Sequence, residues 1–343
     1  MQKSIKELKR RINEWEKFSE ITVVHHFDMD GCCSASLLYR LFNKLNIKGY
    51  FIPATIGFEQ VVIEKLRKQN PEKVLLVDYI PGSDLIAALK GYNVEIIDHH
   101  HHEKRLEVFD YFTSIDFDTH VSVSYLLYCA LKELGFENLG WIAEIGAFWD
   151  KCLEETEFWK KDVYKKELAN MLPFNLVVSF TQIKGASKIV TILDESSSFN
   201  EAVEKVKESE DYKIAKDVFE KEFREVEFSR KAYPDIKLNM YWIKTRFKHI
   251  RVYVDYISYQ KTGTNIFILN EDSQFKFSFR TSLDINLVNI IRTLAGKVPD
   301  FGGGGHTHAC GGLLRNENVE GFLDEFIKEY RKAVAPDSPN QVF

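Results

Sequence analysis

The residues best suited to chemistry in this sequence are aspartates and histidines that directly follow three short apolar runs, 21–24, 74–77 and 94–97. Strands of a parallel sheet are buried and apolar, and open α/β sheets hold ligands at the carboxyl ends of their strands. Three such strands side by side would gather these side chains, and carboxylates that close repel each other unless they share a cation. The side chains in question are His25, His26, Asp28, Asp30, Asp78, Asp98, His99 and His100.

A further carboxylate ends an apolar helical segment. The segment 141–150 is apolar throughout except for Glu144 and Asp150. A carboxylate at the end of a buried helix needs a partner, whereas one at an exposed helix end is simply solvated. The segment alone leaves both interpretations open for Asp150.

The elements that must position these residues alternate between strand and helix. This alternation predicts an α/β fold with a mainly parallel sheet and helices on both faces. No Gly-x-Gly-x-x-Gly follows the first strand, which disfavours a dinucleotide-binding fold. Ser122 and Ser124 are expected to cap and pack the helix near 121–135. The predicted strands are 21–27, 48–53, 74–79 and 93–98, and the predicted helices are 3–18, 34–45, 59–69, 83–90, 121–135 and 139–149.

A second region of interest lies between 236 and 315, where strand patterns return. In the segment 275–280 three Phe alternate with Lys276, Ser278 and Arg280, which places the Phe rings on one face. The run 302–305 consists of four glycines. Such a run lets backbone amides wrap an anion in a nest, although a hinge or a close strand crossing would also use glycine.

The four ordered segments resemble the motifs of the DHH phosphoesterase superfamily, which includes RecJ exonucleases, nanoRNases and cyclic-dinucleotide phosphodiesterases. The resemblance implies two divalent cations that share Asp78, with His100 and Asp98 as catalytic residues. Relatives place the first histidine at different offsets, so His25 stays an alternative to His26. The metal ligands that the resemblance implies are His26, Asp28, Asp30, Asp78, His99 and Asp150.

The glycine run and the histidine after it resemble the DHHA1 domain that accompanies DHH domains. By this resemblance, Arg280 would grip a phosphate, a task that suits the bidentate fork of arginine. The implied substrate contacts are Arg280, Gly303, Gly304, Gly305 and His306.

Length and composition agree with a two-domain intracellular protein. The chain has 343 residues and a net charge of −5, which argues against a wholly basic nucleic-acid-binding surface. The five cysteines are an odd number without a CxxC pair, so we expect reduced core thiols in a cytoplasmic protein. We expect no membrane association. The predicted limits are 1–155 for a DHH catalytic domain, 156–233 for a helical connector, 234–335 for a smaller α/β DHHA1 domain across an active-site cleft, and 336–343 for a loose tail.

The resemblance implies a metal-dependent exonuclease on single-stranded DNA or RNA, most similar to the compact archaeal branch of RecJ-like proteins. It favours 3′→5′ polarity, a Hef-like repair helicase as partner and a homo-oligomer. Mixed carboxylate and imidazole ligands favour Mn²⁺, with Mg²⁺ as the alternative. The alternative function is a nanoRNase or small-nucleotide (pAp or cyclic dinucleotide) phosphoesterase, and a third is a non-catalytic replication scaffold.

Basic and aromatic residues also alternate in the segment 237–251, where Tyr241 and Trp242 precede Lys244 and Arg246. Such a pattern binds single-stranded nucleic acid by stacking and phosphate contact. An ordinary amphipathic strand has the same pattern, so the segment leaves both interpretations open.

Overall fold

The computed structural model describes residues 1–55, 57–100, 106–117, 119, 121–160, 163–245, 250–271, 274–315 and 318–335. The chain forms two compact units, Met1–Lys213 and Ile214–Phe343. The division falls inside the segment 156–233 that we expected to be a helical connector. The expected tail 336–343 lies outside the described residues. Within the described part of the chain, no helix is both long and apolar enough to cross a membrane.

The first unit is built on a five-stranded sheet in the order β2-β1-β3-β4-β5. All of its strand pairs are parallel, as the sequence predicted. The central strands β3 and β4 are buried along their whole length, because helices cover the sheet on both faces. The strands are β1 Glu20–His26, β2 Lys48–Ala54, β3 Lys73–Val77, β4 Val94–Asp98 and β5 Asp110–Thr113.

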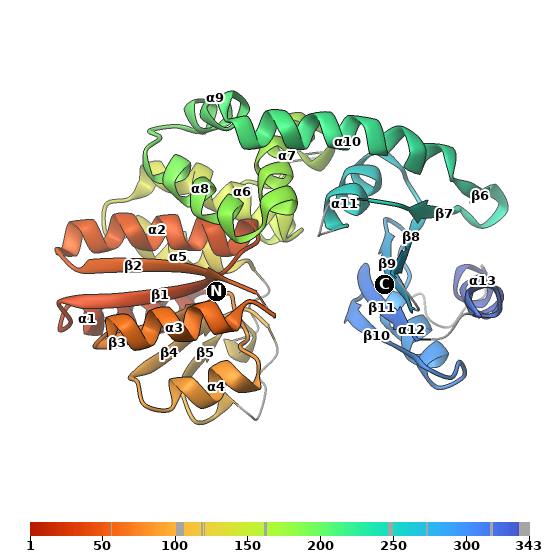
Figure 1. The fold of residues 1–343 in the computed structure, drawn as a ribbon. Helices are drawn as coiled ribbons and strands as arrows, with labels where there is room; N and C mark the ends of the chain where they lie inside the picture. The colour runs from red at the N-terminus through yellow and green to blue at the C-terminus, as the bar shows by residue number, and fades with distance from the viewer. Residues whose placement is uncertain are drawn as a thin grey trace. The chain divides into compact units, whose positions relative to one another are not determined.

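The helices of this unit form the two outer layers. Helices α3 and α4 pack an apolar core against one face of the sheet, and α2 covers the other face, with α5 and α6 packed on α2 (Figure 1). The α-helices are α1 Gln2–Trp15, α2 Met29–Leu45, α3 Glu59–Gln69, α4 Ser83–Leu89, α5 Val123–Lys132, α6 Gly140–Trp149, α7 Val163–Thr181, α8 Ile183–Asp194 and α9 Phe199–Glu208. Short 3-10 helices are η2 Ser114–Phe117, η3 Glu137–Leu139 and η4 Leu153–Glu155.

A buried ion network fastens α1 to the sheet. Arg11 donates to Glu95 on β4 at 3.0 Å, and the indole of Trp15 donates to the other oxygen of the same carboxylate at 3.0 Å. Lys73 on β3 lies 2.9 Å from Glu95 as well. The network lies at the start of the strands, so it belongs to the scaffold.

The strand order creates a topological switch point between β1 and β3. The chain goes from β1 to β2 on one side and then continues with β3, β4 and β5 on the other side. At such a point the loops after the two central strands diverge, and open α/β sheets bind their ligands in the crevice that results. The residues after β1 and β3 include Asp28 and Asp78, so the fold places these two carboxylates at this position.

The second unit is built on a six-stranded mixed sheet in the order β10-β11-β9-β8-β7-β6. Strands β7 and β8 are parallel, and the other pairs are antiparallel. The strands are β6 Lys231–Tyr233, β7 Leu238–Ile243, β8 Thr264–Glu271, β9 Gln274–Thr281, β10 Phe301–His306 and β11 Ala309–Leu314. The helices are α10 Glu210–Phe228, which crosses from the first unit, η5 Pro234–Ile236, α11 Arg251–Gln260, α12 Leu287–Ala295 and α13 Val319–Val334.

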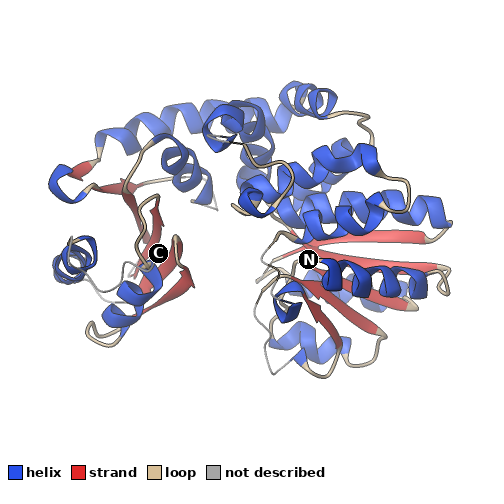
Figure 2. Cartoon of the chain, turned by 180° about the vertical axis from the view of Figure 1, so that it is seen from behind, coloured by secondary structure: helices blue, strands red, loops and turns tan. Residues whose placement is uncertain are grey.

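One face of this sheet carries the core of the second unit. Phe277 and Phe279 of β9 are buried against α12 and α13, which lie on the same side of the sheet (Figure 2). Lys276, Ser278 and Arg280 therefore point to the opposite face, as their alternation predicted. This opposite face is the one on which Arg280 can meet a ligand.

Candidate active site

The first group of site residues lies where β1 gives way to α2. Asp28 is the N-cap of α2, and its carboxylate accepts a hydrogen bond from the amide of Gly31 at 3.2 Å. The other oxygen of Asp28 lies 3.1 Å from Nδ1 of His26. A Cβ on Gly31 would lie 2.1 Å from the carbonyl oxygen of His26, so the tight strand-to-helix turn requires glycine here. The turn thus brings His26 and Asp28 together.

His26 is also supported from β3. Its ring stacks nearly parallel to that of Tyr79, with the centroids 6.2 Å apart. The hydroxyl of Tyr79 donates to Glu59 on α3 at 2.6 Å, and the same carboxylate oxygen accepts the amide of Gly82. These contacts hold the ring of His26 in place.

His25, the alternative to His26, lies in the core. It is 1% exposed, and its Nδ1 lies 2.8 Å from the carbonyl oxygen of His26. Burial lowers its pKa to about 4, so its ring is neutral near pH 7. The geometry favours His26 over His25 as the candidate ligand.

Asp78, directly after β3, is the most constrained carboxylate of the site. Its backbone has a φ of +53°, in the left-handed region that a residue other than glycine rarely adopts. The side chain is 3% exposed, and among the described residues its Oδ2 has no hydrogen-bond partner. Burial and the carboxylates of Asp28 and Asp30 raise its pKa well above the ordinary value. A buried carboxylate oxygen without a donor is the sort of atom that binds a cation.

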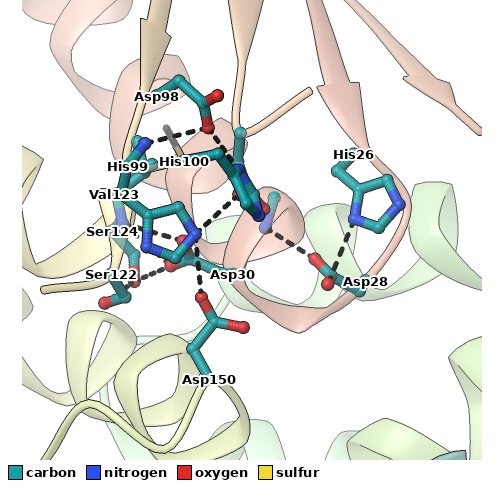
Figure 3. Close-up of polar contacts among 12 residues, drawn as sticks. His26, Asp28, Asp30, Asp98, His99, His100, Ser122, Val123, Ser124 and Asp150 are labelled. Carbon is teal, nitrogen blue, oxygen red and sulfur yellow. Dashed lines mark hydrogen bonds and ion pairs between the residues drawn. The ribbon is translucent and has the colours of Figure 1, made fainter. Parts of the chain in front are cut away.

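His99, after β4, points the same nitrogen at two carboxylates. Its Nδ1 lies 3.1 Å from the carbonyl oxygen of Val121 and can only donate to it, so the neutral ring has its lone pair on Nε2. That Nε2 lies 3.3 Å from Asp78. It also lies 3.3 Å from Asp150, whose carboxylate points toward it in Figure 3. A lone pair that faces two anionic oxygens needs a proton or a metal ion between them. Although burial lowers the pKa of His99, the carboxylates of Asp150 and Asp30 raise it overall.

Asp30 is fixed by the N-terminus of α5. Its carboxylate accepts the amides of Val123 at 2.8 Å and Ser124 at 3.0 Å, together with the Ser124 hydroxyl. Burial and the nearby Asp150 nevertheless raise its pKa to about 7. Ser122 caps α5 by accepting the amide of Tyr125, as predicted for a capping serine. Ser124 does more than the predicted packing, because it orients a site carboxylate.

Asp150 lies at the C-terminus of α6, which approaches α2 and α5 closely. A Cβ on Gly146 would lie 2.1 Å from Oγ of Ser124 and 2.9 Å from Oδ1 of Asp30. Only glycine lets α6 come near enough for Asp150 to reach His99. The carboxylate is therefore held inside the site, where its side chain is 11% exposed, and is not the solvated helix end that the sequence left open.

The six side chains predicted as metal ligands form two overlapping sets. Within each set the ligand atoms all lie within 4.8 Å of one another. Asp78 belongs to both sets. Figure 3 shows that Asp28 points toward His26 and that Asp150 points toward His99 from the opposite side of the site. The sets are His26, Asp28 and Asp78, and Asp30, Asp78, His99 and Asp150.

Asp98 and His100 form a hydrogen-bonded pair beside these sets. Oδ1 of Asp98 accepts Nδ1 of His100 at 2.7 Å and the amide of His99 at 2.8 Å, and Oδ2 accepts the hydroxyl of Tyr111 at 3.2 Å. Burial opposes ionisation of Asp98, but these donors hold its pKa below the ordinary value. Burial likewise lowers the pKa of His100, and Asp98 raises it to about 9 overall. Asp98 thus orients His100 and stabilises its cationic form.

The glycine run in the second unit is a strand. Gly302–Gly305 lie in β10, paired in register with β11, and Gly302, Gly303 and Gly304 have no positive φ. A nest needs residues of left-handed conformation, so the predicted phosphate-wrapping loop is wrong for this segment. The alternative of a close strand approach fits one position. A Cβ on Gly303 would lie 2.6 Å from the carbonyl oxygen of Gly311 and 2.9 Å from Ile291 of α12.

The other face of this strand is open. A Cβ on Gly302 or Gly304 would meet none of the described residues within 4 Å, so packing against them does not require glycine at these positions. The strand register aligns Gly304 with Gly311 and Ser278, which makes a surface nearly free of side chains. Gly305 and His306 continue the strand as backbone, and the side chain of His306 lies outside the part of the chain that the structure describes.

Arg280 borders this surface. Its guanidinium donates to the carbonyl oxygen of Phe279 at 2.9 Å and to Ser278 at 3.1 Å, and it lies 3.5 Å from the buried Asp255 of α11. Burial lowers its pKa, and Asp255 opposes that shift. Arg251 shares the same carboxylate at 3.2 Å. No local pattern in the sequence indicated that Asp255 would lie beside Arg280. Asp255 is on α11, which precedes β9 in the chain, and only the packing of this helix against the strand brings the two residues together.

The basic and aromatic stretch is not one continuous surface. Tyr241 is fully buried and stacks on Phe267 at 5.2 Å, so it cannot stack on a nucleic-acid base. Trp242 is 38% exposed. Arg246, Phe247 and Lys248 lie outside the described residues.

Comparisons with known proteins agree with this architecture. The sequence matches the DHH family, N-terminal domain, over residues 20–114 and the DHHA1 domain over residues 238–335. The chain therefore belongs to the DHH/DHHA1 superfamily, whose members are phosphoesterases. A comparison with curated proteins gave no match.

Solved structures share the fold at low sequence identity. RecJ in complex with Mn²⁺ from Thermus thermophilus is 16% identical, with a TM-score of 0.63 over 96% of this chain and 55% of that one. The DHH domain of a member of the s1p family of ribosomal proteins is 17% identical, with a TM-score of 0.69 over 97% and 92%. A pGpG-specific phosphodiesterase from Vibrio cholerae is 12% identical, with a TM-score of 0.51 over 92% and 99%. The chain thus spans about half the length of the Thermus RecJ chain and has a RecJ-like fold.

Proposed function

We propose that this protein is a metal-dependent phosphodiesterase that degrades single-stranded DNA or RNA from an end and releases nucleoside monophosphates. One observation supports this above the others. Two sets of carboxylate and imidazole ligands share Asp78 at the topological switch point of a parallel sheet. A shared carboxylate between two cation sites is the arrangement that two-metal phosphoester hydrolysis uses. The intact ligand set also argues against a scaffold without activity.

The residues present fit a pair of divalent cations. Oδ2 of Asp78 lacks a donor among the described residues, and the lone pair of His99 faces carboxylate oxygens, so a cation would satisfy both atoms. One cation would be held by His26, Asp28 and Asp78, and the other by Asp30, Asp78, His99 and Asp150. Bound ions would supply an activated water and stabilise the leaving oxygen. Mixed imidazole and carboxylate ligands favour Mn²⁺ over Mg²⁺.

Other side chains of the protein would position the substrate and the metal ligands. Asp98 holds Nδ1 of His100, which leaves Nε2 of that ring to donate to a phosphoryl oxygen. Ser124 and the first amides of α5 keep Asp30 from turning away from the ions. The strained backbone of Asp78 fixes the carboxylate that the two sites share.

In the second unit, Arg280 and the open strand β10 would hold the nucleotide. The guanidinium suits a phosphate, and backbone without side chains lets a ribose or base lie flat on the sheet. A grip of this kind on one nucleotide fits removal of terminal residues. The polarity of 3′→5′, a Hef-like helicase partner, a homo-oligomer and a cytoplasmic location remain predictions from the resemblance.

A short-substrate enzyme, such as a nanoRNase or a small-nucleotide phosphoesterase, is the second candidate function. The burial of Tyr241 favours it, because one of the aromatic residues proposed to stack on a long strand is part of the core. Both functions use the same ions, so substrate length separates them.

The test uses end-labelled single strands of two, five and about twenty nucleotides, with Mn²⁺, with Mg²⁺ or with a chelator. We expect cleavage only with a divalent ion, and a ladder of mononucleotide steps on the longest substrate. A wild-type protein that prefers the dinucleotide supports the second function. Absence of metal-dependent cleavage on every substrate, including cyclic dinucleotides, contradicts the proposal.

A further inference from the structure

Cys152 lies at the edge of the metal-ligand sets because of the way α6 ends. Its amide donates to the carbonyl oxygen of Ala147 at 2.9 Å, and the amide of Lys151 donates to that of Phe148 at 3.2 Å. Lys151 has a φ of +59°. These two bonds and a left-handed residue define a Schellman motif, with lysine where glycine is usual. The motif turns the chain back on itself, so that Cys152 comes next to Asp150.

The thiol therefore joins two candidate metal ligands. Sγ of Cys152, a ring nitrogen of His99 and a carboxylate oxygen of Asp150 all lie within 4.8 Å of one another. Cys32, Cys33 and Cys310 are buried, whereas Cys152 is half-buried, so it differs from the core thiols that the sequence predicted. Its Sγ lies 3.4 Å from the carbonyl oxygen of Asp150, the acceptor of its thiol proton.

A second observation also indicates a cation next to His99. The buried Oδ2 of Asp78 has no hydrogen-bond partner among the described residues, and Oδ1 of the same carboxylate lies 3.3 Å from Nε2 of His99. The imidazole of His99 is thus common to the site that lacks a donor and to the thiol-containing group. His99 and Asp150 belong both to the set that contains Asp78 and to the group that contains the thiol, so a cation held by these two residues would lie beside the sulfur.

We propose that Cys152 is a further metal ligand that makes one of the two sites selective for thiophilic cations. The inference rests on the proposed metal centre. Binding converts the thiol to a thiolate, whose proton passes to solvent, and forms a bond between sulfur and the metal. Imidazole, carboxylate and thiolate together favour Zn²⁺, Co²⁺ or Cd²⁺ over Mg²⁺ and Mn²⁺. The protein would therefore take up a thiophilic ion in this site more tightly than a purely oxygen and nitrogen site would.

The experiment titrates the metal-free full chain with Co²⁺ and records its absorption spectrum. We expect a thiolate-to-cobalt charge-transfer band in the near ultraviolet, together with weaker visible bands of the bound ion. Cys152→Ser should lose the ultraviolet band and keep the visible ones. Cys129→Ser is the matched control, because that half-buried cysteine lies on α5 outside the site, and it should behave like wild type.

A second measurement compares affinities by competition with a metal-binding dye. Cys152→Ser and Cys152→Ala should weaken Cd²⁺ binding roughly tenfold or more, and change Mn²⁺ binding by less than about threefold. Visible bands without an ultraviolet band in wild type, or an ultraviolet band that survives in Cys152→Ser, would overturn the inference and leave the metal centre intact. If wild type binds neither Co²⁺ nor Mn²⁺, the metal centre fails together with it.

Discussion

The two regions that we propose to handle a phosphate, one in each unit, differ in their electrostatics. At the carboxyl ends of β1, β3 and β4 the first unit crowds charged side chains, and burial raises the pKa of Asp78 and Asp30. On the open face of β10 the second unit offers a run of glycines, beside the guanidinium of Arg280. Without a cation, the buried carboxylates of the first unit repel one another, whereas the glycine strand of the second unit contains no such repulsion.

The difference indicates how each region contributes. Under the proposed function, the repulsion among its carboxylates would give the first unit an affinity for divalent ions, which would activate water for hydrolysis. An arginine paired with Asp255 and a flat glycine backbone would supply one charge and a surface that suits binding. Mutations in the first unit should therefore lower kcat, and mutations in the second should raise KM. The predictions below run from the largest expected effect to the smallest.

The largest effect should come from Asp78→Asn, which removes the charge that both ligand sets share. We expect kcat to fall by roughly a hundred- to a thousandfold, with KM nearly unchanged. The metal-free variant should melt at the same temperature as wild type or higher, because repulsion is relieved. Asp84→Asn, at an exposed position of α4, is the control. Turnover close to wild type in Mn²⁺ would contradict the shared-ligand assignment.

Arg280→Lys should have the next largest effect, since it keeps the charge and loses the fork. We expect KM to rise about ten- to a hundredfold with little change in kcat. Arg292→Lys, at an exposed position of α12, should leave KM unchanged. A drop in kcat at constant KM would place Arg280 in the chemistry instead and remove the contrast between the units.

Substitutions of two neighbouring glycines in β10 would distinguish a role in substrate binding from a role in packing. Gly304→Ala should leave stability unchanged, because none of the described residues lies within 4 Å of its Cβ, and should raise KM severalfold if the substrate lies on the strand. Gly303→Ala should lower the free energy of unfolding by about 1–3 kcal/mol, because its Cβ would meet Gly311 and Ile291. Denaturant unfolding and steady-state kinetics on both variants provide the measurement. Equal KM values for Gly304→Ala and wild type would show that the open face is not used.

The smallest effect concerns the stability of the metal-free protein with pH. The raised pKa of Asp30, about 7 against an ordinary 3.8, means that the folded state binds more protons than the unfolded state between these values. This contribution to stability is fully present below the ordinary pKa of about 3.8 and is lost as pH rises to about 7, and the raised pKa of His99 acts in the same direction above its ordinary value of 6.5. The melting temperature should therefore fall as pH rises from about 6.5, above which His25 is neutral in both states, through about 7. Saturating Mn²⁺ should abolish the slope, and a metal-free protein with a flat profile would argue against carboxylates of raised pKa.

The sequence itself determined the local arrangement of this protein. Apolar runs of strand length, each followed by carboxylates or imidazoles, predict both the parallel sheet and the position of these polar side chains at its carboxyl edge. The alternating Phe residues of β9 likewise predict the face on which Arg280 lies. These predictions succeed because hydrophobic periodicity is a local property that the backbone geometry of each element fixes.

Only the tertiary structure decided which residues meet. It favours His26 over His25, brings Ser124 to Asp30 and Asp255 to Arg280, and turns Cys152 toward His99. It also shows that the glycine run is a strand with one packed and one open face, because strand register and the approach of α12 set the surroundings of each glycine. Contacts of this kind depend on how separate elements pack against one another, and no local pattern in the chain records that packing.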